Sequence, residues 1–147
     1  MVVVQTHPRE GGFEMKYDTV LVLDFGGQYC HLIGRRVREN SVYSEIVPHD
    51  IAPQEIEALK EKYNVKGLIL SGGPASVYEK GAPRCKTSLF DVKLPILGLC
   101  YGHQLLAQMV GGRVEPAVRR EYGTTHVIID HSVGVLKGLS AKERAWM

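Results

Sequence analysis

The chain has 147 residues, of which 44% are apolar and 23% are charged, and its formal net charge is +2. This length fits a single domain, and the composition excludes wholesale disorder. The near-neutral charge excludes a nucleic-acid binder that depends on charge alone, and the apolar runs are too short for a transmembrane helix. Three cysteines without a Cys-x-x-Cys pair are typical of a reducing compartment, so we expect a cytoplasmic protein.

The first half of the chain alternates between strand and helix patterns. Residues 1–16 show no sustained hydrophobic period, and we expect them to form an N-terminal tail. The continuous apolar run from Thr19 to Leu23 is typical of a strand that is buried on both faces. Helically spaced apolar residues follow at positions 29–37, a second strand is expected at 42–47, and a short helix is expected to begin at Pro53.

The same alternation continues in the second half. Gly67 to Leu70 reads as a third strand and Pro95 to Leu99 as a fourth, which a helix capped by Gly111-Gly112 follows. Between these two strands, residues 75–93 are expected to be an irregular surface stretch with one helical turn near residue 89. Short strands are expected at 114–118 and 124–129.

This pattern predicts an α/β fold with three layers, in which a mostly parallel, flavodoxin-like or Rossmann-like sheet carries helices on both faces. Ligands of such sheets bind at the carboxyl ends of the strands. Glycine-bearing turns follow three of the expected strands, at 26–27, 72–73 and 98–102. We therefore expect a functional site where these turns meet.

The segment around Cys100 is the most informative in the chain. Gly98 and Gly102 stand two residues before and two residues after the cysteine, between a buried strand and an amphipathic helix. This spacing is typical of a nucleophile elbow, a turn so tight that flanking Cβ atoms would collide with backbone. A helix N-terminus also favours the thiolate, which is the attacking form of cysteine. The other two cysteines, Cys30 and Cys85, are interpreted as buried structural residues.

Two segments resemble the class I, or triad-type, glutamine amidotransferases. Gly98-Leu99-Cys100-Tyr101-Gly102-His103-Gln104 is similar to their nucleophile motif, and Ser71-Gly72-Gly73-Pro74 is similar to their oxyanion loop. Within this family, Leu23 to Tyr29, Arg35 to Glu39 and Arg119 to Gly123 resemble the amidotransferase part of GMP synthases. The likeness runs in order from about Tyr17 to Met147, which would make residues 17–147 a glutaminase domain.

The resemblance implies a mechanism. Cys100 would attack the side-chain amide of glutamine, and the backbone N–H groups of Gly73 and Tyr101 would hold the oxyanion. Ammonia would leave, and water would release glutamate from a thioester. Gln104 would contact the bound glutamine, while Tyr122 and Gly123 would help to hold its amino-acid end.

The resemblance also implies a partner. In GMP synthases the ammonia passes to an ATP-pyrophosphatase domain or subunit, which adenylates xanthosine monophosphate (XMP) and makes GMP. ATP and magnesium would belong to that partner, and this chain would hold no cofactor. Its own sequence shows no convincing metal-ligand spacing.

One part of the family's triad is missing from the sequence. The family takes its histidine base and orienting glutamate from a downstream His-Pro-Glu segment, and the only similar residues here, His7-Pro8-Arg9-Glu10, lie in the tail. We therefore expect a glutaminase domain that is incomplete at its C-terminus and turns over poorly. His103, about one helical turn from Cys100, is a weak candidate for a substitute base.

Three alternatives stay open at this point. The chain could be a noncatalytic, amidotransferase-like binding or regulatory module, or an amidotransferase that serves another acceptor. It could also be a mononucleotide binder that uses Gly26-Gly27 as a phosphate loop, although two glycines without a fuller fingerprint are common.

Overall fold

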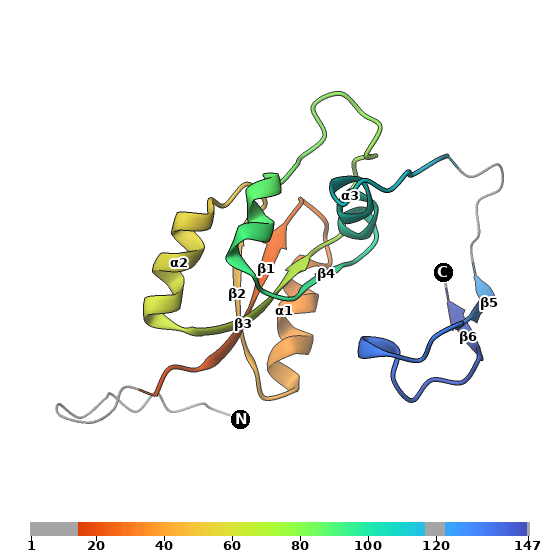
Figure 1. Cartoon of the computed structure of the whole chain (residues 1–147), viewed down its shortest axis with the longest axis horizontal. Helices are drawn as coiled ribbons and strands as arrows, with labels where there is room; N and C mark the ends of the chain where they lie inside the picture. The colour runs from red at the N-terminus through yellow and green to blue at the C-terminus, as the bar shows by residue number, and fades with distance from the viewer. Residues whose placement is uncertain (1–14, 117–122, 147) are drawn as a thin grey trace. The chain divides into compact units, whose positions relative to one another are not determined.

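The computed structural model describes residues 15–116 and 123–146, and it divides the chain into two compact units, Met1–Val114 and Glu115–Met147. The tail was expected at residues 1–16, and residues 1–14 of it lie outside the described part of the chain. Each unit is described by itself below, and Figure 1 shows the elements of both.

The first unit contains a four-stranded parallel sheet, which confirms the predicted α/β class. The strands lie in the order β2-β1-β3-β4, and each neighbouring pair is parallel. Their bounds are β1 Asp18–Asp24, β2 Tyr43–Pro48, β3 Asn64–Leu70 and β4 Ile96–Gly98. All four fall within two or three residues of the predicted positions, because a glycine, proline or aspartate lies at or within two residues of the end of each apolar run.

Helices cover both faces of this sheet, as the alternation predicts. Alternate β1 residues, Leu21 and Leu23, share a core with residues of α2 (Pro53–Lys62), the 3₁₀ turn η1 (Thr87–Val92) and α3 (Tyr101–Met109). Val20, which precedes Leu21, lines a pocket on the other side together with residues of α1 (Cys30–Glu39). Figure 1 shows α1 and α2 on opposite sides of the strands. Since successive strand residues point to opposite faces, a continuous apolar run is needed to serve both layers.

Residues 75–93 correct one expectation. They contain the predicted helical turn, η1, and most of them are exposed or partly exposed, but they do not lie at the surface throughout. Val77, Cys85, Leu89 and Val92 are all buried and belong to the core on the α2 side of the sheet. This segment has no long hydrophobic period because its apolar residues fill gaps between α2 and α3 singly.

The second unit contains an antiparallel pair of strands. The predicted strand at 124–129 is confirmed as β5 (Thr124–Ile128), and it pairs with β6 (Lys142–Trp146), which the sequence pattern did not reveal. Between them lies a 3₁₀ turn, η2 (Gly134–Leu136). The strand expected at 114–118 is wrong for residues 114–116, which form no strand, and its last two residues lie outside the described part of the chain.

Candidate functional site

The register of the parallel sheet brings three turns to one edge. Leu23 of β1 pairs with Leu70 of β3, and Leu70 pairs with Gly98 of β4, so these three strands end at the same level. The turns that leave them begin at Asp24, Ser71 and Leu99. The predicted convergence of the glycine-bearing turns is therefore confirmed.

Cys100 occupies a strained position between β4 and α3. Its φ of 50° lies in the left-handed region that non-glycine residues rarely adopt, and its side chain is exposed. A Cβ at Gly98 would lie 2.6 Å from the Cα of His103, and one at Gly102 would lie 2.3 Å from the carbonyl oxygen of Leu70. Both flanking positions thus require glycine, as the elbow interpretation predicts, and the turn presents the sulfur to solvent.

The Ser71-Gly72-Gly73 turn lies directly beside the cysteine. A Cβ at Gly72 would be 3.4 Å from the Cβ of Cys100. In the described part of the chain, neither the N–H of Gly73 nor that of Tyr101 donates a hydrogen bond to another residue. Gly73 belongs to the turn beside Cys100 and Tyr101 follows Cys100 directly, so both N–H groups are available to a ligand near the exposed sulfur.

A pocket of about 450 Å³ opens at this place. It is lined by residues from all three turns, namely Gly26, Gly27, Gln28, Tyr29, Gly72, Gly73, Pro74 and Cys100. Half of the lining residues are glycines, which leaves room for a small ligand close to the sulfur. The Asp24 side chain caps the first turn, since its Oδ1 accepts a 2.8 Å hydrogen bond from the N–H of Gly26. The Asp24 carboxylate at this turn repels phosphate, and this weighs against the use of Gly26-Gly27 as a phosphate loop.

The other two cysteines differ from Cys100 in burial. Cys30 and Cys85 are buried, as predicted. Burial raises the pKa of the Cys85 thiol. Burial also raises the pKa of Cys30, and the Asp24 carboxylate adds to this effect. Because the thiolate is the reactive form, both thiols are protected from electrophiles.

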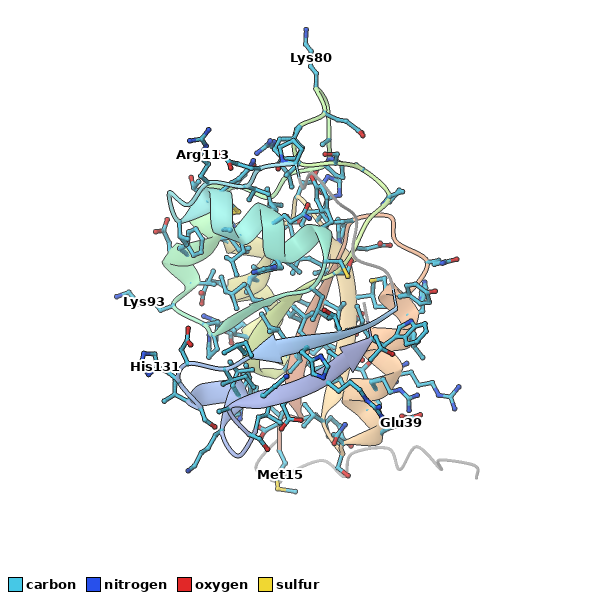
Figure 2. All side chains as sticks on the ribbon, turned by 90° about the vertical axis from the view of Figure 1, so that its right-hand side faces the viewer. Met15, Glu39, Lys80, Lys93, Arg113 and His131 are labelled. Atoms are coloured by element: carbon cyan, nitrogen blue, oxygen red, sulfur yellow. The ribbon has the colours of Figure 1, made fainter. Side chains whose placement is uncertain are left out.

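Tyr101 joins the elbow to the loop before η1. Its side chain is 3% exposed, and its hydroxyl donates a hydrogen bond to the carbonyl of Pro83. Burial raises the pKa of this phenol, so it stays protonated and able to donate. Arg84 fastens the same loop through a 2.8 Å hydrogen bond to the Val77 carbonyl and a 3.3 Å bond to Gln108 of α3. Figure 2 shows Lys80 at the tip of the loop, pointing away from the sheet.

The remaining predicted site residues have different outcomes. Gln104 is exposed on α3, one turn beyond Cys100. Gly123 lies in the second unit, immediately before β5, and Tyr122 lies outside the described residues. Their roles stay predictions. The side chain of His103 is exposed and forms no hydrogen bond with Cys100 in the described structure, so nothing here supports it as a substitute base.

Sequence reasoning missed the contribution of Phe25, Gln28 and Tyr29. Gln28 and Tyr29 line the pocket, and Phe25 lies buried beneath it. Their position directly after a buried strand was the available signal. Across residues 15–116 and 123–146, no group of three or more metal-ligating side chains is found, and no helix is long and apolar enough to cross a membrane.

Comparison with known proteins extends these observations. Residues 21–147 match the family described as glutamine amidotransferase class-I. The chain is 51% identical over 133 residues to the GMP synthase [glutamine-hydrolyzing] of Caldanaerobacter subterraneus subsp. tengcongensis, and 48% identical over 136 residues to that of Bifidobacterium longum. These matches cover 90% and 92% of this chain but only 25% of each relative, so the chain spans about a quarter of the length of these curated relatives.

A solved structure agrees with the fold. The crystal structure of a GMP synthase subunit from Thermoplasma acidophilum is similar with a TM-score of 0.72 and 33% sequence identity. The match covers 90% of this chain and 65% of that chain.

Proposed function

We propose that this chain, which belongs to the class I glutamine amidotransferase family, carries the glutamine-attacking site of a GMP synthase. One observation carries the proposal. The exposed sulfur of Cys100 lies on a turn with φ of 50°, and it is flanked by the unpaired N–H groups of Gly73 and Tyr101. A buried structural cysteine would need none of these features.

The arrangement supports attack on a carboxamide. The Cys100 sulfur forms a bond to the amide carbon of glutamine, and the carbonyl π electrons move onto oxygen. That oxyanion lies between the N–H groups of Gly73 and Tyr101, each of which is worth about 3 kcal/mol of barrier by analogy with other oxyanion donors. The tetrahedral carbon then expels ammonia as its nitrogen takes up, through water, the proton that the Cys100 thiol lost on attack. Water attacks the resulting thioester, releases glutamate and restores the thiol.

The resemblance to the family assigns further residues to the rest of the substrate. Gln104, on the exposed side of α3, is proposed to contact the bound glutamine, and Tyr122 and Gly123 to hold its amino-acid end. The ammonia would serve an ATP-pyrophosphatase domain or subunit that converts XMP to GMP, and ATP and magnesium would belong to that partner. All three cysteines are free thiols, which is consistent with a reducing cytoplasm.

The test is covalent labelling by a chloroketone analogue of glutamine. As Cys100 attacks, a carbon–sulfur bond forms and chloride leaves, so the adduct is stable and can be located by peptide mass spectrometry. This reaction needs only the nucleophile and the oxyanion donors, and it requires no turnover. We expect modification of Cys100, protection by L-glutamine but not by D-glutamine, and no modification of Cys30 or Cys85.

Two controls make the test decisive. Cys100→Ser should abolish labelling, and ammonia release from glutamine should be measured with and without an added ATP-pyrophosphatase partner. Equal modification of all three cysteines, or no modification, would contradict the proposal. Selective labelling without ammonia release under either condition would indicate the noncatalytic binding module instead.

A further inference from the structure

Phe25 contacts both sides of the candidate oxyanion site. On one side, Gly73 lies so close that a Cβ added there would be 2.6 Å from the Phe25 carbonyl oxygen and 3.3 Å from its Cβ. On the other side, the Phe25 ring lies against the Tyr101 ring, with centroids 5.5 Å apart and planes tilted by 49°. These two neighbours carry the two N–H groups proposed as donors, so Phe25 contacts the backbone of one donor residue and the side chain of the other.

The backbone and ring of Phe25 are themselves held firmly. Its N–H donates a 3.2 Å hydrogen bond to the Oγ of Ser71, whose own carbonyl accepts a 3.1 Å bond from the N–H of Gly102. The Phe25 ring also lies near the His49 ring, at 5.5 Å between centroids. The side chain is 2% exposed, so its ring has little freedom to move. Phe25 is therefore a firmly held neighbour of both donor residues.

We propose that Phe25 is a positioning residue, whose backbone and ring set the spacing between the Gly73 and Tyr101 N–H groups around the sulfur of Cys100. This inference rests on the proposed function, because the spacing matters only if the two groups hold an oxyanion. Phe25 touches no part of the reacting amide, and it acts through its two neighbours. Oxyanion donors lose their effect steeply with displacement, and a shift of about 1 Å can lower a rate about 100-fold.

The substitution Phe25→Leu tests the spacing. Leucine keeps an apolar side chain at this position but removes the ring that packs against Tyr101. A matched control is Tyr63→Leu, which removes a ring from a similar pair, since Tyr43 and Tyr63 lie 5.4 Å apart with a 33° tilt. Tyr43 begins β2 and Tyr63 directly precedes β3, so this pair lies at the amino end of the sheet, away from the elbow.

The readout is a ratio of two labelling rates at Cys100. The chloroketone analogue of glutamine has a carbonyl that the two donors polarise, whereas iodoacetamide alkylates the thiolate by direct displacement of iodide without an oxyanion. We take the rate with the chloroketone divided by the rate with iodoacetamide. A change in the exposure or ionisation of the sulfur alters both rates and cancels in this ratio, and such a change is what a merely structural role would produce. We expect Phe25→Leu to lower the ratio about tenfold and Tyr63→Leu to leave it within about twofold.

Each contrary outcome has a distinct meaning. If Phe25→Leu lowers both rates equally, or neither, the ratio is unchanged and the positioning role is overturned. If both variants lower the ratio to the same extent, a general loosening of the sheet explains the result, and the proposal is again overturned. If Cys100 in the protein without substitutions shows no preference for the glutamine analogue over iodoacetamide, the proposed function itself fails, and the positioning role fails with it.

Discussion

Replacing Gly102 with alanine distinguishes two opposite expectations about the elbow. Within a helix, alanine is ordinarily more favourable than glycine by about 1 kcal/mol, so the substitution in α3 would stabilise an unconstrained turn. Here, however, the added Cβ would lie 2.3 Å from the carbonyl oxygen of Leu70 and 2.6 Å from its carbonyl carbon. Both are backbone atoms of a buried strand, and they cannot rotate away. The sign of the stability change therefore tests whether the close approach is real.

The displacement that the Cβ demands sets the size of the effect. To bring the 2.3 Å contact to the 3.0 Å below which real Cβ contacts essentially never fall, α3 must move about 0.7 Å from β3. That movement would stretch the 3.1 Å hydrogen bond from the Gly102 N–H to the Ser71 carbonyl. Overpacking of this kind costs about 1–3 kcal/mol, and we expect the free energy of unfolding to fall by that amount.

Chemical denaturation followed by circular dichroism measures this change, and chloroketone labelling of Cys100 measures its effect on the site. The control is Gly111→Ala, at the other end of α3, where φ is +85° and nothing lies within 4 Å. That variant should lose about 1–2 kcal/mol through left-handed strain alone and label at the natural rate. A Gly102→Ala protein that is as stable as the natural chain, and labels as fast, would refute the reasoning.

Three further predictions concern neighbouring groups. Ser71→Ala should lower the free energy of unfolding by about 1–3 kcal/mol, because it leaves the buried Phe25 N–H without its acceptor, and an unchanged thermal midpoint would contradict this. Burial, assisted by the Glu45 carboxylate, raises the pKa of Tyr43 from 10 to about 12. Its contribution to stability is thus fully present below pH 10 and is lost as the pH rises toward 12, so Tyr43→Phe should flatten alkaline unfolding, and identical curves for the two proteins would exclude the effect. Titration with an aromatic disulfide should show one fast thiol, Cys100, and two that react only on unfolding, whereas three equal rates would disprove the assigned burial.

Local sequence was sufficient to predict the strands and the elbow. A continuous apolar run such as Thr19 to Leu23 is typical of a strand that is buried on both faces. All of its residues except Val20 are fully buried. The glycines at 98 and 102 similarly predicted a turn that admits no Cβ, and both positions proved to be obstructed by backbone. The backbone that obstructs Gly98 belongs to the elbow itself, so a short window contains that constraint, whereas Gly102 is obstructed by Leu70 of β3 and was predicted from the spacing of the motif alone.

Long-range features could not be predicted in this way. The segment 75–93 was expected at the surface because its apolar residues follow no period, yet Val77 and Leu89 are almost fully buried. These side chains fill spaces that exist only after α2 and α3 have packed on the sheet. The strand β6 was missed for a related reason, since the exposed alternation in Lys142 to Trp146 becomes a strand only through its pairing with β5.

The candidate site combines both kinds of information. Each of its turns can be predicted from local sequence, but the spacing between them depends on the register that pairs Leu23 with Leu70 and Leu70 with Gly98. A one-residue slip of β3 would exchange its buried faces and carry Gly73 away from Cys100. Burial of Leu21, Leu68 and Leu70 on one face therefore does more than stabilise the fold. It helps to specify the register of the strands, and the register in turn places the Gly73 turn beside Cys100.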